Sequence, residues 1–332
     1  MPEFRKDPVT GQWVIIRTER PHRPEEFRPQ APTRSPGPCV LCEGREAELP
    51  PELLSYRATA DEQSGASGWR VRVVPHKFPT LRVEGELERR GHGLYDLMNG
   101  VGAHELVIES PRHDETLADL SLPALEDVLH AYQQRMADLR RDTRFRSVVV
   151  FKSVGATGPT LDHAHSHLLA TPTVPPALNH EIMHARSYFD YRERCLFCDI
   201  LQQEADEGQR MVAESEHVVA IVPFAARSPF ETWLAPRRHR ASYEHISPVE
   251  RRDLARVLKG VLQRVRVLLS DAPVAFVLHS APVGEDDAPY FHWHLELTPS
   301  VLIPGLPSDG SGFPVNPLPP EDAALLLRGV VG

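Results

Sequence analysis

The sequence lacks long apolar runs. No run approaches the roughly 18 apolar residues that a membrane-spanning helix needs. Residues 1–20 alternate charged and apolar positions, and they lack the apolar core of about seven or more residues that a secretory signal contains. We therefore expect a soluble, cytoplasmic protein that does not associate with a membrane.

Basic residues are also comparatively scarce. The 37 lysines and arginines are outnumbered by 46 acidic residues, which gives a net charge of −9. The basic residues are dispersed or stand beside acids, so the continuous positive groove of a nucleic-acid-binding protein is not predicted. Small anionic ligands remain compatible with this charge, because they need only a few local arginines.

Cysteine is rare, but its arrangement is regular. The four cysteines form two Cys-x-x-Cys pairs, Cys39/Cys42 and Cys195/Cys198. Such a pair is either a redox dithiol or half of a zinc site. A redox pair normally opens a helix after a strand, whereas Pro36-Gly37-Pro38 precedes the first pair. A zinc site would need two further ligands for each pair.

The most unusual stretch is a row of alternating histidines. His163, His165 and His167 lie in residues 162–172 and run into an apolar tail that ends at Pro172. A period of two is the period of a β-strand, so all three rings would leave one face, about 7 Å apart from one Cα to the next. Such a row suits a metal cage, a proton relay or a histidine nucleophile, and neutral imidazole can attack phosphorus.

Apolar periodicity predicts the regular elements. Strands are expected at 12–18, 69–74, 104–109, 147–153 and 166–171, and helices at 123–141 and 248–269. The proline-rich stretches 21–38 and 299–320 are predicted to be extended connections. At 332 residues the chain is long enough for one large domain or two of ordinary size.

The second half of the chain repeats the order of the first. Ser110-Pro-Arg-His113 precedes the first predicted helix, and Ala235-Pro-Arg-Arg-His239 precedes the second. Each block follows a Cys-x-x-Cys pair and is followed by a strand that carries histidines, which predicts a duplicated unit. Two structural zinc sites follow, each with two thiolates and two imidazoles. Their ligands would be Cys39, Cys42, His113 and His163 in the first, and Cys195, Cys198, His239 and His292 (or His294) in the second.

A series of short motifs runs nearly end to end through the chain. It includes Arg5-Lys-Asp-Pro-Val-Thr-Gly-Gln-Trp-Val-Ile-Ile, Cys39-Val-Leu-Cys42-Glu-Gly, Val73-Val-Pro-His-Lys-Phe-Pro, Ser110-Pro-Arg-His, the histidine row and Phe291-His-Trp-His. In this order the motifs resemble the galactose-1-phosphate uridylyltransferase family, in the short form common in bacteria and archaea, within the histidine-triad superfamily.

The resemblance implies a fold and a reaction. The fold would be α+β, with two fused, zinc-braced histidine-triad-like halves at residues 1–180 and 181–332, each an antiparallel sheet with a packed helix. The family often forms homodimers whose active sites use both subunits. Its reaction is a double displacement: a histidine takes the nucleotidyl group of a nucleotide sugar, releases a sugar 1-phosphate and passes the group to another, as between UDP-glucose and galactose 1-phosphate.

The resemblance also implies individual roles. His165 would be the nucleophile, and His163 a zinc ligand. Arg20 and Arg23 would contact the nucleotide sugar, and Thr160 stands where a serine touches the phosphoryl group.

Four positions depart from the family pattern. His167 replaces a glutamine, Ser153 and His76 replace asparagines, and Pro307 stands in place of a glutamate that helps to read the hexose. We expect His76 and Ser153 to contact substrate. We expect His167 to be catalytic, since a histidine that is protonated near pH 7 can donate to a departing oxygen.

These departures leave the base, the sugar and the acceptor open. The leading expectation is transfer to a sugar 1-phosphate. A nucleotide-sugar phosphorylase, a histidine-triad hydrolase and a zinc-braced nucleotide-binding protein without turnover are the alternatives.

Overall fold

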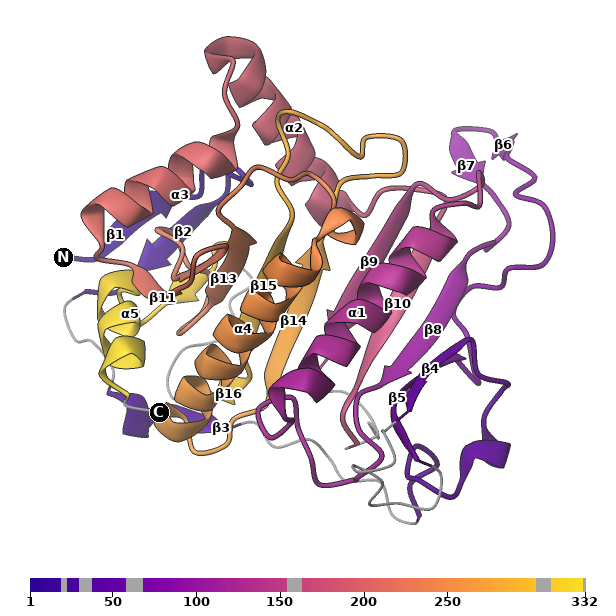
Figure 1. Cartoon of the computed structure of the whole chain (residues 1–332). Coiled ribbons are helices and arrows are strands. Elements are labelled where there is room, and N and C mark those ends of the chain that lie inside the picture. Colours follow the sequence, from indigo (N-terminus) through magenta and orange to yellow (C-terminus); the bar gives the residue numbers. More distant parts are fainter. Residues whose placement is uncertain (19–22, 30–37, 58–67, 154–162, 303–311, 331–332) are drawn as a thin grey trace.

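The fold is described here from a computed structural model that covers residues 1–18, 23–29, 38–57, 68–153, 163–302 and 312–330 (Figure 1). Within these ranges the molecule is a mixed α+β structure built on one large sheet. No helix in the described part of the chain combines the length and the apolarity that crossing a membrane requires.

The central sheet has ten strands, and each neighbouring pair is antiparallel. In sheet order they are β11 (Met211–Glu214), β12 (Val218–Ile221), β13 (Thr232–Pro236), β15 (His294–Pro299), β14 (Val274–His279), β9 (Ser147–Lys152), β10 (His165–Thr171), β8 (Ala103–Ile108), β5 (Trp69–Pro75) and β4 (Leu54–Arg57).

The sheet has the same strand order on both sides of its middle. Helix α1 (Leu122–Leu139) belongs to the first side and helix α4 (Pro248–Leu268) to the second. Outward from the central β9 and β14 pair, each side has the two strands that follow its helix, then the strand before the helix, then two earlier strands. The structure thus repeats its strand order as the sequence repeat predicts. The histidine-triad likeness of each half stays a prediction.

Helices α1 and α4 lie side by side on one face of the sheet (Figure 1). Both begin with serine caps: Ser121 accepts the backbone N–H of Ala124, and Ser247 forms a reciprocal capping box with Glu250. Each helix has proline in its first turn, where no backbone hydrogen bond is lost. Buried residues recur at three to four positions along both helices, so each turns an apolar stripe to the sheet.

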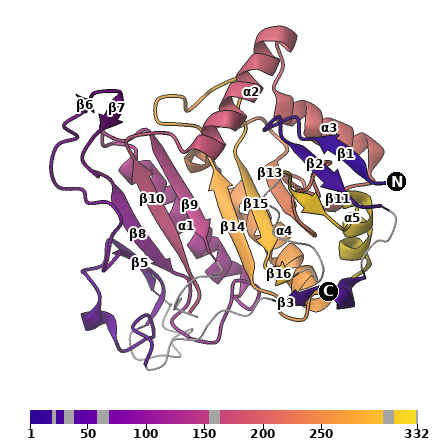
Figure 2. The ribbon, with the colours of Figure 1, turned by 180° about the vertical axis from the view of Figure 1, so that it is seen from behind.

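Strand β10 alternates between the two faces of the sheet. Ser166, Leu168 and Ala170 are buried, and the Ser166 hydroxyl bonds the Tyr132 hydroxyl of α1 at 2.7 Å. His165 and His167 are half-buried and leave the opposite face. In the reverse view, the central strands lie in front of α1 and α4 (Figure 2). His165 and His167 therefore lie on the face that these two helices do not cover, whereas His163 is buried just before the strand.

Smaller elements complete the described fold. Three small sheets combine β1 (Glu3–Lys6), β2 (Trp13–Ile16) and β17 (Val315–Asn316); β3 (Arg28–Pro29) and β16 (Val301–Leu302); and β6 (Arg90–His92) and β7 (Tyr95–Leu97). The remaining helices are α2 (Pro176–Arg192), α3 (Leu196–Glu207) and α5 (Pro320–Gly329), with short turns η1 (Pro24–Glu26), η2 (Glu46–Glu48) and η3 (Tyr243–His245).

The five predicted strands and two predicted helices are confirmed within a few residues at their ends. The domain boundary at residue 180 stays a prediction. Strand β2, at the N-terminus, pairs in parallel with β17 near the C-terminus, so the first residues of the chain lie against the second half.

Candidate active site

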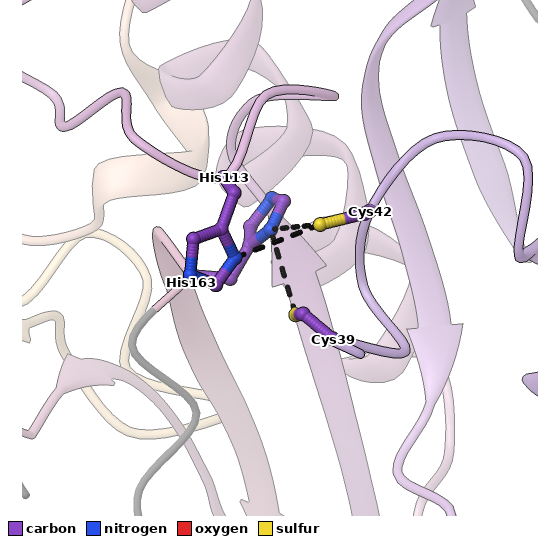
Figure 3. A group of neighbouring side chains, drawn as sticks. All are labelled: Cys39, Cys42, His113 and His163. Carbon is purple, nitrogen blue, oxygen red and sulfur yellow. Dashed lines mark hydrogen bonds between the residues drawn. The ribbon is translucent and has the colours of Figure 1, made fainter. Parts of the chain in front are cut away.

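The first Cys/His group forms where three loops meet (Figure 3). Cys39 and Cys42 come from the loop before η2, His113 follows β8, and His163 directly precedes β10. The Nδ1 atom of His163 lies 3.7 Å from Cys39 Sγ and 3.6 Å from Cys42 Sγ, and His113 Nδ1 lies 3.6 Å from Cys42 Sγ. All four predicted ligands therefore converge.

The second group repeats the first. Cys195 directly precedes helix α3, Cys198 lies in its first turn, His239 follows β13, and His292 precedes β15. Cys198 Sγ lies 3.5 Å from His239 Nδ1 and 3.6 Å from His292 Nδ1. The hydrogen bond from the Cys198 side chain is the main cause that lowers the pKa of the Cys195 thiol, and the same contact raises the pKa of Cys198, so without a metal the pair shares one proton and Cys195 is the thiolate.

Both groups fit a tetrahedral metal ion. Zn–S bonds of about 2.3 Å and Zn–N bonds of about 2.0–2.1 Å, joined at a tetrahedral angle, place sulfur and nitrogen about 3.6 Å apart. The five sulfur to nitrogen distances given above are 3.5–3.7 Å. Two thiols and two imidazoles also form the donor set that zinc prefers.

Backbone carbonyls orient His163 in the first group and both histidines in the second, where His239 donates from Nε2 to the carbonyl oxygen of Ala288 at 3.2 Å. The Nε2 atom of His163 donates to the carbonyl oxygen of Ser110 at 2.7 Å, and that of His292 donates to Pro236 at 2.9 Å. Ser110 and Pro236 each precede the other histidine ligand of their group, His113 or His239, by three positions. With its hydrogen on Nε2, each ring turns an unprotonated Nδ1 toward the cysteines.

His165 is held in one orientation by its own strand. Its Nδ1 donates to the carbonyl oxygen of His163 at 2.7 Å, which leaves the lone pair on Nε2. Burial, followed by the charge of Lys152, lowers the pKa of His165, although the hydrogen bond to His163 opposes this. Lys152 is itself paired with the buried Glu109 at 2.5 Å. A neutral ring with an aimed lone pair has the properties of a nucleophile.

His167 is packed among other rings. It stacks on Phe151, with ring centroids 5.0 Å apart, and its Nδ1 lies 3.1 Å from Nε2 of His104. Burial, followed by the charges of neighbouring histidines, lowers the pKa of His167 to about 3. The ring is therefore uncharged at pH 7, and the expectation that it is protonated near neutrality is wrong. Its catalytic role stays a prediction.

The residues predicted to bind substrate are only partly brought together. His76 joins the histidine row, since its ring stacks on His104 at 4.2 Å and lies 5.9 Å from that of His167. Ser153 is exposed at the end of β9, and Arg23 is exposed before η1. Arg20 and Thr160 lie outside the described residues.

His104 is the site neighbour that the sequence did not reveal. It lies in a predicted strand, but only the register of β8 against β10, which pairs His104 with Leu169, brings its ring to His167.

The second half contains a closed counterpart of His165. His294 donates from Nδ1 to the carbonyl oxygen of His292 at 3.1 Å, as His165 does to His163. However, His294 is only 1% exposed, and its Nε2 lies within 3.7 Å of carboxylate oxygens of Glu181 and Glu296. The structure thus places His292, and not His294, beside the cysteines.

Known proteins resemble this chain over nearly its whole length. An ADP-glucose phosphorylase from Arabidopsis thaliana is 35% identical over 337 residues, which cover 99% of this chain and 93% of that protein. A galactose-1-phosphate uridylyltransferase from Thermotoga maritima is 27% identical over 338 residues, or 99% of this chain and 98% of that protein. A crystal structure of an A. thaliana ADP-glucose phosphorylase with bound ADP-glucose matches with a TM-score of 0.81 and 32% identity, and covers all of both chains.

The fold, the site and these relatives together define an enzyme of the nucleotidyltransferase class. The chain belongs to the galactose-1-phosphate uridyl transferase family. The family's N-terminal domain matches residues 1–175, and its C-terminal domain matches residues 181–301.

Proposed function

We propose that this enzyme transfers the nucleotidyl group of a nucleotide sugar to inorganic phosphate through a nucleotidyl-His165 intermediate. The observation that carries the proposal is the geometry of His165, which donates from Nδ1 to the His163 carbonyl at 2.7 Å and keeps its lone pair on Nε2. The choice of phosphate as acceptor is supported by the 35% identity to an enzyme named ADP-glucose phosphorylase. ADP-glucose is accordingly the first substrate to test.

The reaction has two displacements at the same phosphorus atom. In the first, Nε2 of His165 attacks the α-phosphorus, an N–P bond forms, and the bond to the bridging oxygen breaks, so that a sugar 1-phosphate leaves. In the second, an oxygen of inorganic phosphate attacks the same phosphorus and the N–P bond breaks. The products are a sugar 1-phosphate and a nucleoside diphosphate, and His165 is regenerated.

The two Cys/His groups have a supporting role in this proposal. Both would hold structural zinc, with all four positions filled by Cys39, Cys42, His113 and His163 or by Cys195, Cys198, His239 and His292. When bound, the ion supplies a cross-link and no open coordination position. The first group includes His163, whose carbonyl orients His165. Zinc there would fix the carbonyl that determines where the lone pair of His165 points.

Transfer to a sugar 1-phosphate is the second candidate. The family models and the 27% identity to a galactose-1-phosphate uridylyltransferase favour it, and it would place the protein in galactose metabolism. Both candidates share several further proposals. The protein would be a cytoplasmic homodimer, and each chain would divide at residue 180 into two histidine-triad-like units. The substrate would be contacted by Arg20, Arg23, His76, Ser153 and Thr160.

An intact-mass experiment separates these possibilities. The protein is incubated with ADP-glucose or UDP-glucose, and the adduct is then exposed to phosphate, to galactose 1-phosphate or to buffer alone. We expect an adenylyl adduct on His165 that phosphate removes with release of ADP. His165→Ala should form no adduct, whereas His92→Ala, a change on the exposed strand β6, should behave like the wild type.

Each other outcome has its own meaning. A uridylyl adduct that only galactose 1-phosphate discharges supports the second candidate. Rapid loss of the adduct in buffer alone indicates a hydrolase. The absence of any adduct with either nucleotide sugar contradicts the proposal.

A further inference from the structure

His104 connects the backbone to the histidine row, and it has no role in the mechanism described so far. Its Nδ1 accepts the backbone N–H of Thr80 at 3.2 Å, and its Nε2 lies 3.1 Å from Nδ1 of His167. Its ring is stacked against that of His76, with centroids 4.2 Å apart and planes inclined by only 10°. The ring is thus restrained on an edge and on a face.

These contacts determine where each ring carries its hydrogen. The N–H of Thr80 can only donate, so Nδ1 of His104 must be unprotonated and Nε2 must carry the hydrogen. That hydrogen is donated to Nδ1 of His167, so the hydrogen of the neutral His167 ring must lie on Nε2. This chain of hydrogen bonds starts at the backbone N–H of Thr80, which can act only as a donor, so the direction of every later hydrogen bond is fixed.

The rings of His104 and His167 are both neutral at pH 7. Burial is the main cause that lowers the pKa of His104, to about 4, and the pKa of His167, to about 3. At pH 7 neither ring is an acid, and each has one donor and one acceptor nitrogen.

The same reasoning disfavours a metal ion in this cluster. One ring nitrogen from each of His76, His104 and His167 lies within 4.8 Å of the others, as in a three-histidine metal site. A metal would need an unprotonated nitrogen from each ring. Those of His76 and His104 accept the backbone N–H groups of Phe78 and Thr80, and that of His167 accepts from His104. The unprotonated nitrogens of the three rings are therefore already used as hydrogen-bond acceptors, and the hydrogen of each ring lies on its other nitrogen.

We propose that His104 is a positioning residue that locks His167 in the tautomer with hydrogen on Nε2, so that His167 offers a fixed neutral N–H to the nucleotidyl group on His165. The rings of His165 and His167 are neighbours, with centroids 5.1 Å apart and planes inclined by 69°. A neutral N–H can stabilise a phosphoryl oxygen and keeps its proton, as the amide of the family's glutamine would. The functional half of this inference rests on the proposed function, and the tautomer half does not.

Nitrogen NMR tests the tautomer directly. Protein labelled with ¹⁵N-histidine is studied at pH 7, and the signals of His167 are assigned by their loss in His167→Gln. We expect His167 to be protonated at Nε2 and unprotonated at Nδ1. In His104→Phe, which keeps a flat ring without the donor, both tautomers should appear; His104→Gln, which restores an N–H, should retain the single tautomer.

The control and the contradicting results are equally direct. His92→Phe, on the exposed strand β6, should leave the His167 signals unchanged. Protonation of His167 at Nδ1 in the wild type would overturn the inference. So would an unchanged Nε2–H population in a folded His104→Phe, or a tautomer mixture in both His104→Phe and His104→Gln.

Kinetics test the connection to transfer. His104→Phe should lower kcat about tenfold with little change in KM, the effect expected for one well-placed hydrogen bond. His104→Gln should recover most of that loss.

A double variant tests whether His104 acts through His167. In a His167→Ala background, His104→Phe should have no further effect on kcat, because the ring that His104 orients is absent. A second tenfold fall in kcat would show that His104 acts independently and would overturn the inference. If no variant or wild type transfers any nucleotide, the proposed function fails while the tautomer result is still measured.

Discussion

His165 and His294 occupy equivalent places in the two halves of the sheet, and each donates from Nδ1 to the carbonyl oxygen of the histidine two residues earlier, at 2.7 and 3.1 Å. His165 is half-buried on the face that α1 and α4 leave uncovered, whereas His294 is only 1% exposed. The local backbone geometry is therefore not what distinguishes a reactive histidine from a structural one. The difference lies in what covers the ring.

The first prediction compares the two histidines by alanine substitution. His165→Ala should lower turnover at least about a thousandfold, because it removes the nucleophile, while the free energy of unfolding changes by less than about 1 kcal/mol. His294→Ala should lower the free energy of unfolding by about 3 kcal/mol, because it leaves a cavity where the ring of this buried residue was packed. Turnover assays and urea unfolding of both variants provide the measurement. Near wild-type turnover in folded His165→Ala would contradict the mechanism.

The second prediction concerns metal content. Elemental analysis of the purified protein should find about two zinc ions per chain, one for each closed four-ligand set. Cys42→Ser and Cys198→Ser should each lose one ion and unfold at lower urea concentration, because metal-binding energy is part of the folding energy. A zinc content of one or none in the wild type would contradict the duplicated arrangement of ligands.

Much of the arrangement follows from local sequence pattern. Apolar residues at helical spacing identify α1 and α4. The alternation of the histidines identifies the strand face of His165 and His167, although His163 lies before β10 and not in it. The repeated ligand order identifies the eight Cys and His residues that the structure brings into two groups. These features depend on neighbours in the sequence or on an internal repeat, both of which can be read from one chain.

Features that depend on strand register, or on which element packs over a side chain, could not be predicted from the sequence. His104 reaches His167 only because β8 and β10 pair in one particular register. Glu181 closes over His294 only because α2 lies there, and no local pattern connects a glutamate of α2 with a strand more than a hundred residues away. Similarly, the edge pairing of β9 with β14, which joins the halves into one sheet, is not marked by their apolar residues.

The third prediction tests how α1 supports the histidine strand. The Tyr132 hydroxyl bonds Ser166 Oγ at 2.7 Å and donates to Glu109 Oε1 at 3.3 Å, all within the buried core. Tyr132→Phe should lower the free energy of unfolding by about 1–3 kcal/mol, because it leaves two buried polar groups without this partner. Urea unfolding measures the change. Tyr95→Phe, on the exposed strand β7, is the matched control and should change stability by less than about 0.5 kcal/mol.

The last prediction is a pH dependence of stability that originates in the second half of the chain, at the buried pair of His279 and Glu181. His279 Nδ1 lies 2.9 Å from Glu181 Oε2, and both side chains are buried. Burial opposes the charged ring, but the charge and hydrogen bond of Glu181 outweigh it and raise the pKa of His279 to about 9, from 6.5. Because the folded pKa is the higher one, this pair stabilises the fold fully below about pH 6.5, and its contribution is lost as the pH rises through about 9.

Glu181→Gln removes the carboxylate and should therefore remove this decline. Urea unfolding at pH 6 and pH 9 should show the wild type losing up to about 3 kcal/mol more than Glu181→Gln across the interval, the value that corresponds to a shift of about 2.5 pKa units. At pH 6 the variant should already be the less stable protein, because a buried ring has lost its partner. His92→Gln, on the exposed strand β6, should follow the wild type at both pH values. A parallel decline in Glu181→Gln and the wild type would mean that the ring of His279 is neutral in the folded protein, and the carboxylate of Glu181 would then act only as a hydrogen-bond acceptor.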